Sequence, residues 1–548
     1  MKKKNIQNGN NASHFPDFPS CKRRAGDRGT LTGLTTAFLL LLTLLHGASA
    51  KTVVIYHTCD VHGWYFARPA TWNRKNPQRI AGGFPALSAL VKKEKNPYIL
   101  LDSGDMAQGT PEGTVSRGMA SVALMNRLGY SAAVPGNHDY DFGEENLKRL
   151  ISSSTFSWLG ANVCRKKDGG TVSYLKPYII KEIAGEKIAI LGLLAERVYY
   201  TTLPENVEHL EFRNEAKEAA KWVDEIKRQK PDAIVVLIHG GLSLEFSTKM
   251  VNPAGWKPGR ADESKGALAV ARAAEGIAAV FGGHLHTGLA PAYRDPESGT
   301  LIAESFWGLN GTSRVELEFD DKTGKFIGAG GGMVYLWTDE TGEDPDVKAV
   351  LKPFQDSVRA EMDEVLGETE VDLSRDDGGT DSVIGNWVSD AMRKAMGTDL
   401  ALMNTFGIRA DMPRGKITMR DSYQVMPFDN TVVTADINGE QIVKIMKHYL
   451  RPNGTLLQIS GAKVIYSVSA DGRVKNVRVN INGRPVVPKT FYSVATNQYL
   501  TSSGPEGKLF ADGKNLKDTG TLIRDMLINE VRTSSPVKMP KGERIIRE

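Results

Sequence analysis

Five short segments of this sequence carry histidine, aspartate or asparagine, and each follows an apolar stretch typical of a β-strand. They are Asp60-Val61-His62, Gly104-Asp105, Gly136-Asn137-His138-Asp139, His239-Gly240 and Gly283-His284-Leu285-His286. Loops beyond the carboxyl ends of strands are where open α/β sheets form their sites. A single histidine at a strand end is more often a hydrogen-bonded structural residue. Five such loops in one region predict a functional site.

The residue types in these loops predict two adjacent metal ions. One set of expected ligands is Asp60, His62 and His286, and the other is Asn137, His239 and His284. Asp105 is expected to bridge the two ions, because the two oxygens of a carboxylate can bind two cations that would otherwise repel each other. Two ions roughly 3.5–4 Å apart can deprotonate a shared water and neutralise charge on a phosphoryl oxygen. Mixed imidazole, carboxylate and amide ligands suit Zn, Mn, Fe or Co better than Ca or Mg.

The order of the five motifs resembles that of the calcineurin-like metallophosphoesterase superfamily. The resemblance implies phosphoester hydrolysis with two divalent ions. It also implies a catalytic dyad of His138 and Asp141, in which Asp141 orients and charges the imidazole. His138 would then stabilise the phosphoryl group in the transition state or help the leaving oxygen depart. Asp141 can alternatively cap the following helix, and the two roles are compatible.

The elements that must position these loops follow from the apolar pattern. Strands are expected at 52–56, 98–102, 188–191, 233–238 and 279–281, and helices at 81–95, 121–128, 144–152, 214–229 and 263–274. This alternation predicts an α/β domain with helices flanking the sheets. A glycine-rich run at 328–332 and a polar run at 338–346 are expected to interrupt it. Residues 347–366 are expected to form one charged helix.

A second, smaller α/β domain is expected beyond Val371. Its predicted helix spans 382–396, and its predicted strands span 400–404, 431–437, 463–469 and 491–496. The expected division is therefore a signal peptide at 1–50, a catalytic domain at 51–337, a linking helix at 338–370 and a substrate-binding domain at 371–548. The resemblance further implies that the catalytic domain has four layers, in the order α/β/β/α.

Residues 371–548 resemble the C-terminal domain of the 5′-nucleotidase family. The motifs that carry the resemblance are Gly385-Asn386, Asn404 to Arg409, Pro427 to Asn430, and Thr496 to Tyr499. The resemblance implies that Asn404, Gly407 and Arg409 form a polar loop for ribose and phosphate, and that Phe428 and Tyr499 sandwich the base. A stacking platform accepts any base, which would permit several nucleotides.

Several positions depart from the pattern of this second family. Val383 replaces a frequent asparagine, and Thr405-Phe406-Gly407 replaces a Gly-Gly run before Ile408. Thr380 stands where many relatives carry an arginine. A Gly-Gly-Asp-Gly-aromatic motif expected after Tyr499 is replaced by residues 502–507. The catalytic half is intact, whereas the half that sets specificity has diverged.

The N-terminus has the features of a cleaved secretory signal. Basic residues precede a nine-residue apolar run at 37–45, and Ala48-Ser49-Ala50 follows. Such a run is too short to span a membrane, which requires about 20 residues, and it is typical of a signal peptide. The alternative is a buried core helix. We expect cleavage near Ala50, a secreted or periplasmic protein and no stable membrane anchor. The two remaining cysteines, Cys59 and Cys164, form no disulfide scaffold.

Length and charge exclude several classes of protein. The 548 residues predict two or three domains, and 41% hydrophobic with 24% charged residues excludes a disordered or fibrous chain. The first 50 residues hold seven basic and two acidic side chains, which accounts for the whole net charge of +5. The remaining chain is neutral, so no nucleic-acid polymer is expected as a partner.

Together these features predict an exported enzyme that removes the 5′-phosphate from small-molecule nucleotides. One alternative is an enzyme for 2′,3′-cyclic nucleotides, 3′-nucleotides or nucleotide-sugar diphosphates, because these activities share the architecture. Another is a non-enzymatic binding or adhesion protein built on a retired phosphatase. That alternative predicts lost metal ligands, and no ligand is missing. The sequence carries no signal for an oligomeric state.

Overall fold

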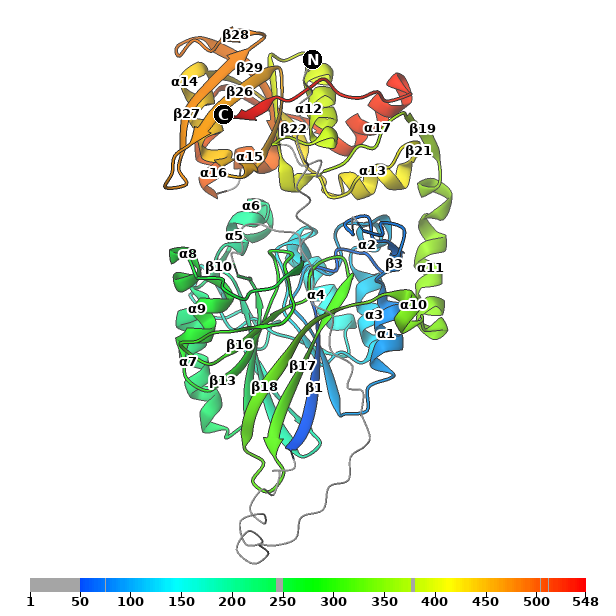
Figure 1. The fold of residues 1–548 in the computed structure, drawn as a ribbon, viewed down its shortest axis with the longest axis vertical. Helices are drawn as coiled ribbons and strands as arrows, with labels where there is room; N and C mark the ends of the chain where they lie inside the picture. The colour runs from blue at the N-terminus through cyan, green and yellow to red at the C-terminus, as the bar shows by residue number, and fades with distance from the viewer. Residues whose placement is uncertain (1–49, 74, 243–249, 376–379, 503, 511) are drawn as a thin grey trace, which may run out of the picture. The chain divides into compact units, whose positions relative to one another are not determined.

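The computed structural model describes residues 50–548 except 74, 243–249, 376–379, 503 and 511. Residues 49–548 form one compact unit. The expected signal peptide lies outside the described residues, apart from Ala50, which begins the first strand (Figure 1). Within the described residues, no helix is both long enough and apolar enough to cross a membrane. Cys59 and Cys164 are buried free thiols.

The first half of the chain contains two six-stranded sheets. The first has the order β18 (Phe326–Tyr335), β17 (Gly311–Asp320), β1 (Ala50–Thr58), β4 (Tyr98–Asp102), β5 (Ala132–Ala133) and β6 (Ser157–Trp158). The second has the order β15 (Tyr293–Arg294), β16 (Leu301–Glu304), β13 (Ile277–Gly282), β11 (Ala233–His239), β9 (Glu186–Leu194) and β8 (Tyr178–Ile183). The central strands of both sheets run parallel.

Burial on both faces explains the continuous apolar runs of the central strands. In β11, Val235 and Leu237 pack into the core that also contains the strands of the first sheet. Ile234 and Val236 instead pack on the opposite face, against α7 (Glu215–Arg228) and α9 (Gly266–Ala273). Strands covered on both faces lose the polar alternation of half-exposed strands.

Helices α1 (Phe84–Val91) and α3 (Met119–Leu128) cover the outer face of the first sheet, so helices lie on both outer sides of the paired sheets (Figure 1). This arrangement confirms the predicted α/β/β/α layers.

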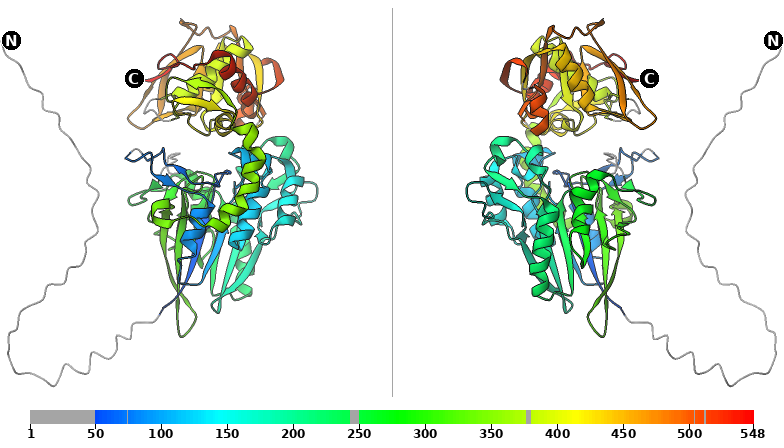
Figure 2. Two further views of the ribbon diagram at one scale, coloured as in Figure 1. Left: turned by 90° about the vertical axis from the view of Figure 1, so that its right-hand side faces the viewer. Right: turned by 90° about the vertical axis from the view of Figure 1, so that its left-hand side faces the viewer.

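A short helix and a long helix lead out of this half. After α10 (Thr338–Thr341), helix α11 (Pro345–Met362) begins at Asp344, whose side chain accepts a hydrogen bond from the Asp346 amide. Helix α11 packs on α1, α3 and α2 (Pro111–Val115), and it faces the viewer in the left view of Figure 2.

The second half is also α/β, as predicted. Its main sheet has the order β25 (Leu457–Ser460), β20 (Leu400–Asn404), β29 (Phe491–Asn497), β22 (Thr431–Asn438) and β30 (Lys514–Leu522). On β20, Ala401 and Met403 face a core shared with α12 (Val383–Met396), α13 (Met419–Val425) and α17 (Ile523–Ser534). Leu400 and Leu402 face a second core shared with α14 (Gly439–Tyr449).

A smaller four-stranded sheet also borders this second core. Its strands are β28 (Arg484–Pro485), β27 (Val474–Ile481), β26 (Ala462–Val468) and β31 (Ile545–Arg547).

Three expected helices differ from the prediction, and the first, expected at 81–95, is confined to α1. The helix expected at 347–366 ends at Met362. The residues that follow it form strand β19 (Val365–Thr369), which pairs with β21 (Gly415–Thr418). The helix expected at 263–274 is split into α8 (Arg260–Ser264) and α9. The break falls at Lys265, whose extended conformation, with φ of −148° and ψ of 160°, is outside the helical region.

The glycine run at 328–332 does not interrupt the fold, contrary to the expectation. It lies inside β18, which pairs with β17 along its length. Gly331 has a φ of +132°, and a Cβ at this position would collide with the carbonyl oxygen of Arg314 on the neighbouring strand. The glycine therefore permits a close approach between two strands.

Candidate active site

The predicted motifs converge at one edge of the two sheets. β1, β4 and β5 are parallel neighbours in one sheet, and β11 and β13 are parallel neighbours in the other. Carboxyl ends of parallel strands lie at the same edge, so the loops that follow them can meet. The structure brings seven predicted ligands into one cluster: Asp60, His62, Asp105, Asn137, His239, His284 and His286.

Most of these residues have an uncommon backbone conformation. Positive φ angles between 50° and 75° occur at Asp60, His62, Asp105, His284 and His286. Residues with a Cβ adopt this region rarely, and such strain persists only where the surrounding structure requires it. The backbone strain therefore coincides with the convergence of these side chains.

The cluster contains two groups of possible ligands. In the first, one ligand atom each of Asp60, His62 and His286 lies within 4.8 Å of the others, and in the second the same holds for Asp105, His239 and His284.

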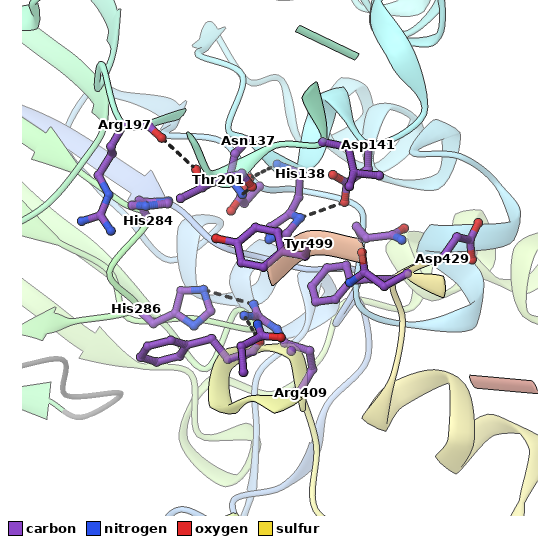
Figure 3. A pocket seen from close by; sticks show the side chains of 18 of the residues that line it. Asn137, His138, Asp141, Arg197, Thr201, His284, His286, Arg409, Asp429 and Tyr499 are labelled. Carbon is purple, nitrogen blue, oxygen red and sulfur yellow. Dashed lines mark hydrogen bonds and ion pairs between the residues drawn. The ribbon is translucent and has the colours of Figure 1, made fainter. Parts of the chain in front are cut away.

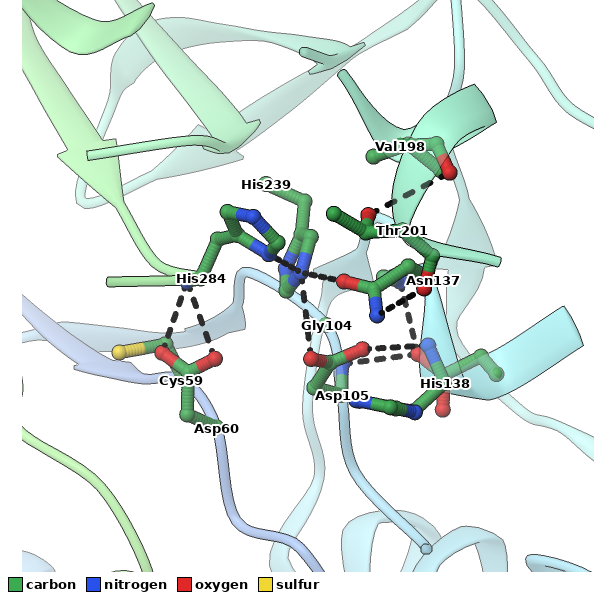
Figure 4. Close-up of polar contacts among 12 residues, drawn as sticks. Cys59, Asp60, Gly104, Asp105, Asn137, His138, Val198, Thr201, His239 and His284 are labelled. Atoms are coloured by element: carbon green, nitrogen blue, oxygen red, sulfur yellow. Dashed lines mark hydrogen bonds and ion pairs between the residues drawn. The ribbon is translucent and has the colours of Figure 1, made fainter. Parts of the chain in front are cut away.

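Asp105 is close to both groups. Its Oδ2 atom lies 3.3 Å from Nε2 of His239 and 3.8 Å from Nε2 of His62. Asn137 joins the second group, with Oδ1 at 3.1 Å from His239 Nε2 (Figure 4). A single carboxylate oxygen therefore faces both histidine groups.

Hydrogen bonds determine which ring nitrogens carry protons. Nδ1 of His62 donates to the carbonyl oxygen of Gln108 at 2.8 Å, and Nδ1 of His239 donates to that of Ser103 at 2.6 Å. In each neutral ring the lone pair then belongs to Nε2 and points into the cluster. Nδ2 of Asn137 donates to the carbonyl oxygen of Thr201, which leaves Oδ1 directed at His239.

When His239 is neutral, its Nε2 atom and Oδ1 of Asn137 are two acceptors that face each other at 3.1 Å. Such an arrangement is repulsive unless a cation lies among the acceptors, and metal-binding histidines characteristically donate their second ring N–H to a carbonyl. The donor set thus fits divalent metal ions.

The electrostatics of the buried cluster also favour positive charge. Burial raises the pKa of Asp60 to about 7. Burial opposes a charged His239, yet Asp105 raises its pKa to about 9. Burial likewise opposes ionisation of Asp105, but His239 and His138 hold its pKa well below the ordinary value. Burial thus disfavours the ionised form of both carboxylates, and nearby positive charge favours it.

His138 and Asp141 form the predicted pair. The carboxylate of Asp141 accepts a hydrogen bond from Nδ1 of His138 at 2.8 Å. Burial disfavours the imidazolium, but Asp141 and Asp105 raise the pKa of His138 above its ordinary value. Helix α4 (Gly143–Ser153) has Phe142 at its N-cap, so Asp141 does not cap it. The side chain of Asp141 is instead hydrogen-bonded to His138.

All five predicted residues of the second half line the same pocket as the first-half cluster. Asn404, Gly407, Arg409, Phe428 and Tyr499 surround it together with Asp105, Asn137, His138, Asp141, His284 and His286 (Figure 3). Asn404 ends β20, and Gly407 belongs to the short helix that follows, η2 (Thr405–Gly407). Tyr499 lies in α15 (Gln498–Ser502).

Two of these residues contact the catalytic half directly. Nη2 of Arg409 lies 2.9 Å from Nε2 of His62 and 3.3 Å from Nε2 of His286. The ring of Phe428 stacks on His138, with centroids 4.7 Å apart and planes inclined by 16°. The family resemblance placed these residues in a substrate-binding region but did not indicate these contacts.

Sequence reasoning missed three residues at the site. Arg197 and Thr201 line the pocket beside His284 (Figure 3). Their segment follows β9, so its place beyond the end of a parallel strand was a usable signal. Gln108 also lines the pocket, and its amide Nε2 donates to the Pro427 carbonyl at 2.9 Å. No sequence pattern indicated that bond.

Comparison with known proteins identifies two matching regions. Residues 53–288 match the family described as calcineurin-like phosphoesterase, and residues 365–512 match the family described as 5′-nucleotidase, C-terminal domain. The chain is 26% identical to Protein UshA of Escherichia coli (strain K12), covering 94% of this chain and 98% of UshA.

A second relative and a solved structure extend these matches. The trifunctional nucleotide phosphoesterase protein YfkN of Bacillus subtilis (strain 168) is 27% identical over 84% of the chain, which spans only 33% of that protein. The crystal structure of a 5′-nucleotidase precursor from Thermus thermophilus has a TM-score of 0.77 and 26% identity, and the match covers 91% of this chain and 99% of that one.

Replacing Asp105 by alanine should abolish phosphoester hydrolysis and lower the bound metal content. The reason is that its Oδ2 atom faces both histidine groups. Metal analysis after reconstitution and turnover of p-nitrophenyl phosphate measure the two effects. The exposed Asp168→Ala variant is the control. Two retained metals with wild-type turnover in Asp105→Ala would contradict the assignment of Asp105.

Replacing His138 by asparagine should preserve metal content but reduce turnover by about 10²–10⁴-fold, the usual contribution of a general acid or base. His138 is bonded to Asp141 through Nδ1 and is not a member of either ligand group. The same two assays apply, with the exposed His209→Asn variant as the control. Parallel loss of metal and rate would instead make His138 a metal ligand.

Proposed function

Since this chain belongs to the 5′-nucleotidase family, with a calcineurin-like phosphoesterase domain followed by a 5′-nucleotidase C-terminal domain, we propose that it removes the 5′-phosphate from nucleotides. The chain is a metal-dependent phosphoester hydrolase. The proposal assigns the chemistry to residues 51–337 and substrate recognition to residues 371–548, with 338–370 as the linker.

One observation carries the proposal. A single pocket is lined by members of both ligand groups and by His138 and Asp141. The same pocket is lined by five residues of the second half: Asn404, Gly407, Arg409, Phe428 and Tyr499. A phosphate at the metal-binding cluster is then within reach of side chains suited to ribose and base. The non-enzymatic alternative predicts lost ligands, and the cluster retains every one of them.

Two divalent ions are the proposed cofactors. Asp60, His62 and His286 would hold one, Asn137, His239 and His284 would hold the other, and Asp105 would contact both. When bound, such ions lower the pKa of water and neutralise charge on the phosphoryl group. The donor set suits Zn, Mn, Fe or Co.

The remaining steps belong to protein side chains. Because Nδ1 of His138 is engaged by Asp141, its Nε2 atom is the one that can donate a proton. A raised pKa keeps more of this imidazole protonated near neutral pH, so His138 can donate to the leaving oxygen. The guanidinium of Arg409, beside His62 and His286, supplies fixed positive charge for phosphoryl oxygens.

Phe428 and Tyr499 are the proposed base-binding aromatics. Both line the pocket, and they come from separate segments, the loop after α13 and helix α15. Stacking on aromatic faces is tolerant of base identity, so this site is expected to accept several nucleotides.

We also propose export with removal of the signal peptide near Ala50. The motif at residues 37–50 supports this, and Ala50 is the first residue of β1. Amino-terminal sequencing of the protein recovered outside the cytoplasm tests it. A chain that retains its first 50 residues there would contradict cleavage at this position.

A substrate panel with metal-reconstituted protein should show the highest kcat/KM for AMP. The panel contains AMP, a 2′,3′-cyclic nucleotide, UDP-glucose and p-nitrophenyl phosphate, and phosphate or nitrophenol release is the readout. A higher value for the cyclic nucleotide or UDP-glucose would replace the proposed substrate by that one. If the protein with both metals bound hydrolyses none of them, the proposed enzymatic function is wrong.

Replacing Phe428 or Tyr499 by alanine should lower kcat/KM for AMP by about 10- to 100-fold, because stacking is worth roughly 1–3 kcal/mol per base. Hydrolysis of p-nitrophenyl phosphate should change much less, since its ring is too small to span both aromatics. Phe491→Ala, at an exposed aromatic of the same half, is the control. An equal drop for both substrates would mean that these rings support the fold instead.

A further inference from the structure

Arg524 of α17 lies behind the loop that carries Phe428. Its side chain is 6% exposed, and Nη1 donates to the carbonyl oxygens of Met426 at 3.3 Å and Pro427 at 3.2 Å. Nη2 donates to Oδ1 of Asp429 at 2.7 Å. One guanidinium therefore binds the residues on both sides of Phe428.

The guanidinium is itself held in place. Its central carbon lies 4.1 Å from the ring centroid of Tyr423, which belongs to α13. The same core contains Met426, Ile523 and Leu527, so α17 packs directly beneath the loop. A planar guanidinium that stacks on an aromatic ring and donates hydrogen bonds through both Nη atoms has little rotational freedom. The arginine thus provides a rigid support.

The supported loop is connected to the catalytic half at two points. The carbonyl of Pro427 also accepts the hydrogen bond from Gln108 Nε2, and the main-chain carbonyl of Gln108 fixes the ring of His62. The next residue, Phe428, stacks on His138. The catalytic half therefore holds this loop from one side, and Arg524 holds it from the other.

Arg524 also offsets a negative charge in the pocket. Asp429 lines the pocket, and its charge contributes to the raised pKa of Asp141, although burial and Asp105 raise that pKa more and His138 lowers it. A nucleotide phosphate would be repelled by an uncompensated carboxylate there. The ion pair with Arg524 holds the Asp429 carboxylate and compensates its charge.

We propose that Arg524 is a positioning residue for nucleotide recognition, which sets the Phe428 loop against the pocket through its bonds to Met426, Pro427 and Asp429. The inference rests on the proposed function, because it takes Phe428 as a base-binding residue. Arg524 acts through the loop and does not line the pocket. It also lies beyond residues 365–512, the region that matches the 5′-nucleotidase C-terminal family.

The test compares Arg524→Lys with wild-type enzyme. Lysine keeps the charge but cannot make the bonds of the planar fork. The expected result is a 10- to 100-fold rise in KM for AMP, because a small displacement of a substrate-positioning group has an effect of about this size. Calorimetry should show a matching loss of affinity for adenosine. kcat and p-nitrophenyl phosphate hydrolysis should stay within about threefold.

Arg532→Gln is the matched control, because Arg532 lies on the same helix but forms an exposed ion pair with Glu364. Equal losses for AMP and p-nitrophenyl phosphate, or no loss for AMP, would overturn the proposal. If Arg524→Lys does not fold, Tyr423→Leu removes only the ring beneath the guanidinium and should give the same selective rise in KM at a smaller size. An unchanged KM for AMP in Tyr423→Leu then overturns it.

The outcomes separate this proposal from the proposed function. If wild-type protein neither hydrolyses AMP nor binds adenosine, the nucleotidase assignment fails before any variant is compared. If wild-type protein does both, only the variants decide the role of Arg524.

Discussion

One carboxylate organises the site. Asp105 follows a parallel strand and has a φ of +58°, and its Oδ2 atom faces both His62 and His239. Its Oδ1 atom accepts the backbone N–H of His138, and its own N–H donates to the carboxylate of Asp139. The same residue therefore sets the separation of the two ligand groups and the position of the candidate proton donor.

Around this carboxylate, the fold supplies acceptors from both sheets. Strands of the two sheets end at a common edge, and carbonyl groups of Ser103 and Gln108 fix the orientation of the histidine rings. Burying so many acceptors is costly without compensating positive charge. The cluster is built for cations, and the backbone strain at five of its residues is borne by the paired sheets beneath.

The second half contributes contacts that are as specific as those of the catalytic half. Arg409 approaches His62 and His286, Phe428 stacks on His138, and Gln108 bonds Pro427. In the proposed enzyme, nucleotide recognition and phosphoryl chemistry therefore share residues instead of occupying separate sites.

Local sequence patterns were sufficient to predict the layered α/β architecture, most strand positions and the candidate ligand set, because these depend on apolar periodicity and on short motifs at strand ends. The same patterns misjudged the glycine run in β18 and the end of α11, where pairing with another strand overrides local preference. The tertiary structure was needed to show which ligand atoms face each other, which ring nitrogens carry protons, and how Gln108, Arg197 and Arg524 join the site. These contacts link residues up to hundreds of positions apart. Their geometry follows from side-chain packing across sheets and halves, which leaves no periodic trace in the sequence.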